Sequence, residues 1–151
     1  MGLKNYTSTV PVDRSLAQIE KTLIDLGATN ISKSINEQKE VDGIVFLISV
    51  DGKPLLFKLK ARVDEVFKVL WKDVSPRSIH KKEVKNNRRE QAKRTAWKLL
   101  FDRIQMDATD IKLGQMELLE VFLTRAYDLQ NDQTFFEKIK ANDFKQLTEG
   151  K

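Results

Sequence analysis

The chain has 151 residues, of which 40% are hydrophobic and 32% are charged, and its formal net charge is +5. That length is typical of one domain, and that composition can bury a core and stay soluble. The absence of cysteine excludes disulfides, thiol nucleophiles and thiolate metal sites, and no stretch resembles a signal peptide or a membrane span.

The positive charge is concentrated in one part of the sequence. Residues 1–71 carry a net charge of +1, and residues 104–151 carry a net charge of −3. Between them, residues 72–103 hold eleven basic and four acidic side chains, a net charge of +7. Such an asymmetry indicates a polyanionic partner, or an acidic surface of the same protein.

The first elements follow from alternation and helical spacing. Residues 6–12 (YTSTVPV) alternate and predict a strand. A helix should follow, with Asp13 as its N-cap and Gly27 as a left-handed C-cap residue. Residues 29–35 alternate again and predict a second strand. The helix is expected to bury Leu16, Ile19, Leu23 and Leu26.

The clearest element is a hairpin over residues 43–61. Asp51-Gly52 is a type I′ turn signal, and a two-residue loop fixes the register of the two strands. All the large apolar partners then meet on one face. The expected pairs are Val50 with Lys53, Ile48 with Leu55, Phe46 with Phe57, and Ile44 with Leu59. The other face carries Val45, Leu47 and Leu56 beside two lysines.

Helices dominate the rest of the chain. A short one is expected over residues 64–71, and Pro76 breaks it. Asn87 and Glu90 resemble a capping box that begins a long helix, and Gly114 should end that helix. Its expected buried residues are Ala92, Ala96, Trp97, Leu100, Ile104 and Ile111. A further amphipathic segment at 116–127, a turn at Asn131-Asp132 and a last helix at 134–141 complete the chain.

These elements predict an α+β fold. We expect a mostly antiparallel sheet in the order β-α-β-β-β-α, followed by a helical C-terminal half. The sheet region should occupy residues 1–75, a basic loop residues 76–87, and a helical region packed on the sheet residues 88–144. All of these should form one compact domain, and residues 145–151 should form a flexible tail.

Four stretches together carry a family resemblance: YTSTVPV, LIDLGA, GIVFLISVDGKPLLFKL and REQAKRTAWKLL. With them the chain resembles, over roughly residues 6–144, a family of small, mostly uncharacterised proteins encoded by bacteriophages and prophages. The last stretch is the most distinctive of the four. The resemblance implies a phage origin, a host cytoplasm and an accessory role, and it implies no activity.

Little in the sequence indicates catalysis. His80 is the only histidine and lies among basic residues in a polar stretch, where a surface role is the commoner one. Two carboxylate pairs, Asp107 with Asp110 and Glu117 with Glu120, are one helical turn apart, and a solvated helix face explains them better than a cation site. No phosphate loop, dinucleotide fingerprint or nucleophile elbow is present. We therefore expect a protein that is not an enzyme and that needs no cofactor or metal.

The basic stretch is the strongest functional candidate. A projecting helix end with a basic loop can contact phosphates, whereas aromatic side chains that could stack bases are missing from the stretch, so base readout is not expected. The expected nucleic-acid-binding residues are Arg77, Lys81, Lys82, Lys85, Arg88, Arg89 and Lys93.

Two other interpretations stay open. The basic residues could simply be a solvated helix start. Alternatively, the protein could bind a host or phage protein or sequester a small ligand, for example against host defence, using the apolar sheet face of Val45, Leu47 and Leu56 if no helix covers it. No membrane association is expected, and the sequence does not indicate an oligomeric state.

Overall fold

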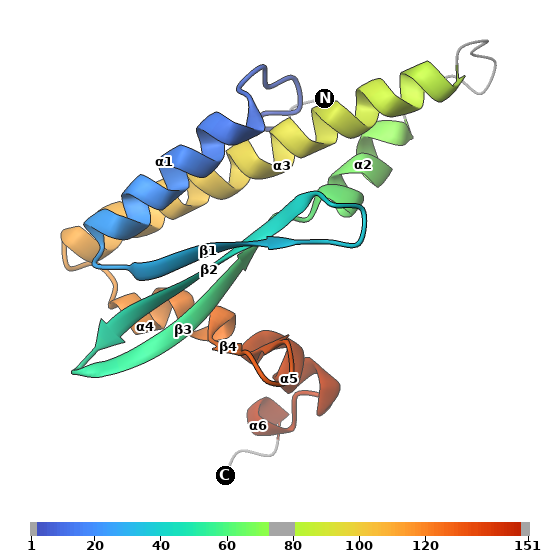
Figure 1. Cartoon of the computed structure of the whole chain (residues 1–151). Helices are drawn as coiled ribbons and strands as arrows, with labels where there is room; N and C mark the ends of the chain where they lie inside the picture. The colour runs from blue at the N-terminus through green and yellow to red at the C-terminus, as the bar shows by residue number, and fades with distance from the viewer. Residues whose placement is uncertain (1–2, 73–80, 149–151) are drawn as a thin grey trace. The chain divides into compact units, whose positions relative to one another are not determined.

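The computed structural model describes residues 3–72 and 81–148 and shows a mixed α+β fold (Figure 1). In the described part of the chain, no helix is both long enough and apolar enough to cross a membrane. The elements in chain order are α1 (Val12–Asp25), β1 (Thr29–Ile35), β2 (Val41–Val50), β3 (Lys53–Lys60), α2 (Val63–Trp71), α3 (Lys81–Lys112), α4 (Leu118–Phe122), the 3-10 helix η1 (Leu123–Arg125), β4 (Tyr127–Asp128), β5 (Gln133–Thr134), α5 (Phe135–Ala141) and α6 (Lys145–Thr148).

The chain divides into two compact units, each built from segments that are distant in sequence. Unit 1 comprises Met1–Leu23 and Ala61–Ala108, and unit 2 comprises Ile24–Lys60 and Thr109–Lys151. Unit 1 therefore holds α2 and most of α1 and α3. Unit 2 holds both sheets and the elements after α3.

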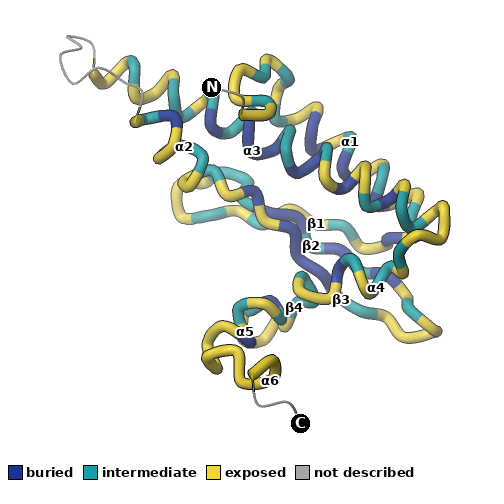
Figure 2. The backbone as a smooth tube through the Cα atoms, turned by 180° about the vertical axis from the view of Figure 1, so that it is seen from behind, coloured by how far each residue is buried: buried dark blue, intermediate teal, exposed yellow. Residues whose placement is uncertain are grey.

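In unit 1, α1 lies alongside α3 (Figures 1 and 2). The helix begins at Val12, so Asp13 lies in its first turn and is not the expected N-cap. Leu26 follows the helix and is half-buried rather than buried. The buried residues of α1 are Leu16, Ile19 and Leu23, as expected, together with Ser15.

The strand expected over residues 6–12 is wrong. Residues 4–7 form a turn and residues 8–11 an irregular segment, while Val12 already belongs to α1. Asn5 has a φ of 61°, and its carbonyl accepts from the Ser8 amide at 2.9 Å. Side chains of α3 hold the segment: Thr95 Oγ1 donates to the Asn5 carbonyl at 2.8 Å, and Gln91 Nε2 donates to the Ser8 carbonyl at 3.0 Å. The backbone carbonyls of Asn5 and Ser8 thus accept from side chains of a helix rather than from a neighbouring strand.

The long helix starts earlier than expected. In the described chain α3 runs from Lys81 to Lys112, so Asn87 and Glu90 lie inside it and form no capping box at its start. Residues 81–87 of the expected basic loop are helical, and residues 76–80 lie outside the described residues. The predicted buried residues are confirmed except Ile111, which is half-buried. The buried residues are Ala92, Thr95, Ala96, Trp97, Leu100, Phe101, Ile104 and Ala108.

In unit 2, β1, β2 and β3 form an antiparallel sheet in that order. The hairpin between β2 and β3 is confirmed, including its register, because Asp51 and Gly52 both have positive φ, at 52° and 80°. Phe46 therefore lies opposite Phe57, and their rings stack with centroids 5.6 Å apart. Phe122 of α4 completes this cluster, 5.9 Å from each of the other two rings.

The C-terminal elements add to this sheet at the edge formed by β3. Ala126 bridges to Phe57, and the two-residue strands β4 and β5 pair with each other across the expected turn, where Asp132 has a φ of 48°. Thr134 then caps α5 by accepting from the Glu137 amide at 3.3 Å. Of the expected flexible tail, residues 145–148 form the single turn α6, none of whose residues is buried, and residues 149–151 lie outside the described chain.

Candidate functional site

The basic residues of α3 gather on one face. Because successive residues in a helix turn by about 100°, six of the seven predicted contacts fall within an arc of roughly 140°. Both glutamates of this stretch, Glu83 and Glu90, lie outside that arc, and Arg77 lies outside the described residues. We name these six residues the basic face; it consists of Lys81, Lys82, Lys85, Arg88, Arg89 and Lys93.

The first turns of α3 have little packing around them. No residue from Lys81 to Gln91 is buried, and the first buried residue is Ala92 (Figure 2). Within the basic face, Lys81, Lys82 and Lys85 are exposed, whereas the other three are half-buried. The exposed lysines are thus available to a partner at the least desolvation cost.

Two members of the basic face also make contacts with acidic and aromatic side chains of the protein. Arg89 Nη1 lies 2.5 Å from Asp64 Oδ1 of α2, and its guanidinium lies over the ring of Phe67, 5.9 Å from the centroid. Lys93 Nζ lies 2.9 Å from Glu90 Oε1, one turn back along α3. These two cations are therefore partly neutralised.

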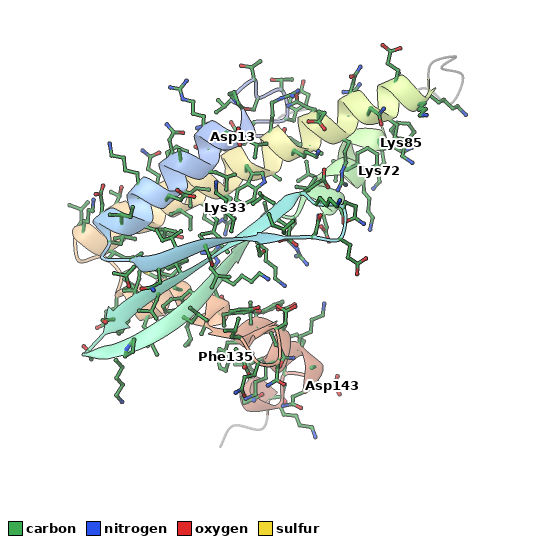
Figure 3. All side chains as sticks on the ribbon, viewed as in Figure 1. Asp13, Lys33, Lys72, Lys85, Phe135 and Asp143 are labelled. Carbon is green, nitrogen blue, oxygen red and sulfur yellow. The ribbon has the colours of Figure 1, made fainter. Side chains whose placement is uncertain are left out.

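An aromatic pair borders the basic face, which the sequence analysis missed. Phe67 and Trp71 of α2 stack with ring centroids 5.8 Å apart and an interplanar angle of 25°. Both residues are half-buried. Their spacing of four residues predicts a shared helix face, but only the contact between Arg89 and Phe67 shows that this face adjoins the basic one. In Figure 3, Lys72 after α2 and Lys85 of α3 are labelled at the same end of unit 1.

The other side of α3 is occupied by the N-terminal segment. Arg94 Nε donates to the Ser8 carbonyl at 3.2 Å, and its Nη2 donates to Gln91 Oε1 at 2.7 Å. Near the same side, a shallow cleft of about 400 Å³ brings Asp13 and Glu90 together with Arg94. With two carboxylates against one cation, this cleft is a poor site for a phosphate.

Asp102 anchors the start of the chain farther along α3. Its carboxylate accepts from Lys98 Nζ at 2.8 Å and from Asn5 Nδ2 at 2.8 Å, and Lys4 Nζ lies 3.6 Å away. Burial raises the pKa of Asp102, but these donors and charges outweigh burial, so the pKa is lowered overall. Asp102 is therefore an ionised structural contact.

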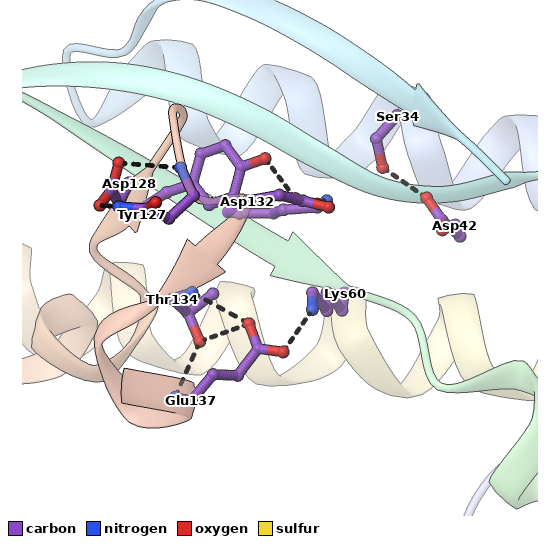
Figure 4. A network of polar contacts seen from close by, with 10 residues as sticks. Ser34, Asp42, Lys60, Tyr127, Asp128, Asp132, Thr134 and Glu137 are labelled. Atoms are coloured by element: carbon purple, nitrogen blue, oxygen red, sulfur yellow. Dashed lines mark hydrogen bonds and ion pairs between the residues drawn. The ribbon is translucent and has the colours of Figure 1, made fainter. Parts of the chain in front are cut away.

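Unit 2 contains a separate polar network (Figure 4). Tyr127 donates to Asp132 at 2.5 Å, and Lys58, whose residue is only 8% exposed, lies 3.6 Å from the same carboxylate and 5.1 Å from the Tyr127 ring centroid. Lys60 pairs with Glu137 at 3.0 Å. The network joins β3 to the β4–β5 turn and to α5, and every one of these charged groups has a partner of opposite sign.

Of the two expected carboxylate pairs, Glu117 and Glu120 form the capping box at the start of α4. Glu120 accepts from the backbone amide of Glu117 at 3.2 Å. His80 lies outside the described residues. Across residues 3–72 and 81–148, no three histidine or acidic side chains gather as a metal site.

Comparison with known proteins adds no relative: no family model, no curated protein and no solved structure matches this chain.

Proposed function

We propose that this protein is a non-enzymatic accessory protein that contacts nucleic acid through the basic face of α3. One observation carries the proposal: six cations share one face of a helix, and the two nearby glutamates lie outside it. Phosphates are spaced regularly along a nucleic acid backbone, and a row of lysines and arginines along one helix face can contact several at once. Each contact releases condensed counterions, which drives binding.

The accessory role and the phage origin rest on the family resemblance of the sequence. Binding without catalysis agrees with a sequence that has one histidine and no cysteine. The competing function, binding of another protein through the sheet face of Val45, Leu47 and Leu56, depends on that face being open. These three residues are half-buried, and nothing in the described part of the chain favours the competing function.

The test is a salt-dependent binding measurement with charge-reversed variants. Binding of fluorescently labelled DNA and RNA is measured by anisotropy at several salt concentrations. We expect Lys82→Glu and Lys85→Glu each to weaken binding alike for all sequences, and to lower the slope of log K against log salt by about one for each lost phosphate contact.

Lys21→Glu is the matched control. Lys21 is exposed on α1 and lies outside the basic face, and its reversal changes the net charge by the same amount. We expect binding by this variant to stay close to wild type. Absence of binding by wild-type protein even at low salt would refute the proposal and leave a protein partner as the function to test.

A further inference from the structure

We infer that the nucleic acid bound by this protein is single-stranded, and that its unpaired bases stack on the aromatic pair Phe67 and Trp71 of α2. The inference rests on the proposed function, since the basic face must hold the backbone. It goes further by assigning a second binding element and by naming the class of nucleic acid.

The first argument is the state of the two rings. Phe67 and Trp71 are stacked on each other, yet neither is buried, so part of their aromatic surface is exposed to solvent. By contrast Trp97 of α3 is 1% exposed and serves the core. A stacked, half-exposed pair of rings is a platform on which a further planar ring can stack.

The second argument is the charge around the platform. Arg89 of the basic face lies over the Phe67 ring and so places α3 cations beside the pair. On α2 itself, Lys68 and the following Lys72 are exposed. Basic residues of two helices thus lie near the rings, together with the carboxylate of Asp64, which pairs with Arg89. The exposed lysines are therefore the cations suited to contact a backbone that runs past stacked bases.

The third argument concerns the class of nucleic acid. In a duplex each base is already stacked and paired, so its ring face cannot reach a protein side chain without costly unstacking. Unpaired bases present both faces, and stacking on aromatic rings tolerates any sequence. Phosphate contacts alone would bind both forms, whereas an aromatic platform favours the single strand.

Tryptophan fluorescence tests the inference directly, because the chain has only two tryptophans. Unlabelled single-stranded DNA and RNA of about 12 nucleotides, and a duplex of the same sequence, are titrated into wild type, Trp71→Phe and Trp71→Leu. We expect single strands to quench wild-type fluorescence and the duplex to leave it nearly unchanged. Trp71→Phe should keep the single-strand affinity and lose the quenching.

Trp71→Leu should lose single-strand affinity by roughly five- to a hundredfold, the range expected for one lost base stack, and keep its duplex affinity. Binding of the duplex by Trp71→Leu also controls for an intact fold. If this variant does not fold, the wild-type and Trp71→Phe titrations still show whether bases stack on Trp71.

The outcomes separate the two proposals. Equal binding of single strands and duplex with no quenching overturns the platform and leaves the basic face standing. No binding of either form at low salt overturns both. Quenching by DNA alone, or by RNA alone, supports the platform and identifies which single strand it takes.

Discussion

Arg89 of α3 and Asp64 of α2 form an ion pair in which Nη1 and Oδ1 are 2.5 Å apart. The sequence leads us to expect that Arg89 contacts phosphates of a nucleic acid. In the folded protein its side chain is only 27% exposed, while that of Asp64 is 72% exposed. The residue therefore links two helices as well as lying on the basic face. A phosphate that approaches Arg89 must compete with a carboxylate, which makes Lys82 and Lys85 better test positions.

The first prediction concerns that ion pair. Arg89→Glu should still fold but should lower the free energy of unfolding by about 1 kcal/mol, because it replaces an attraction with a repulsion at a partly exposed site. The double variant with Asp64→Arg restores opposite charges and should recover part of the loss. Urea denaturation measures both. A single variant as stable as wild type would show that the ion pair contributes nothing.

The second prediction concerns the attachment of the N-terminal segment. Thr95 is 3% exposed, and its hydroxyl donates to the Asn5 carbonyl at 2.8 Å while it accepts from Gln91 at 3.1 Å. Thr95→Val keeps the shape and removes the donor, so it should cost about 1–3 kcal/mol of stability. Limited proteolysis within residues 3–11 should become faster. Thr95→Ser keeps the hydroxyl and is the control, so equal protease sensitivity of the two variants would contradict the prediction.

The hairpin shows where the sequence carries enough information. Asp51-Gly52 selects one turn type, the turn fixes the register, and the register puts Phe46 opposite Phe57. Gly27, with a φ of 100°, likewise ends α1 where expected. In each case the controlling interaction is local, so a few adjacent residues suffice to predict it.

The predictions from sequence were wrong where contacts between residues distant in sequence determine the structure. Residues 6–12 alternate as a strand does, yet Ser8 is held by Gln91 and Arg94, which are 83 and 86 residues away in sequence. The strands β4 and β5 have two residues each, too few for alternation to reveal. The aromatic platform was missed for the same reason, because only the fold brings Phe67 beside Arg89.

The third prediction contrasts two glycines of unit 2. A Cβ on Gly43 would lie 2.7 Å from the Leu59 carbonyl oxygen, which belongs to the strand ladder and cannot easily move. Gly43→Ala should therefore destabilise the protein by roughly 1–3 kcal/mol. Gly52 has a φ of 80° and open space around it, so Gly52→Asn, which tolerates this conformation, should cost less. Urea midpoints of the two variants give the comparison, and the reverse order would contradict the packing argument.

The last prediction concerns the titration of Tyr127. The hydrogen bond to Asp132, followed by burial and nearby carboxylates, raises the pKa of Tyr127 to about 12. A raised pKa in the folded state means that the contribution to stability is present below the ordinary tyrosine value and is lost as pH rises through about 12. Stability should therefore fall across the window from about 10 to about 12.

Ultraviolet absorbance can follow this group alone in a Tyr6→Phe background, because the chain has two tyrosines. Asp132→Asn removes the charged acceptor and should bring the pKa of Tyr127 back toward its ordinary value, and the loss of stability at high pH should shrink with it. Asp128→Asn is the matched control, because the charge of Asp128 affects the pKa of Tyr127 least among these groups and its carboxylate accepts from Asn131. If Asp132→Asn left the titration unchanged, the hydrogen bond to Asp132 would not be the main cause of the raised pKa of Tyr127.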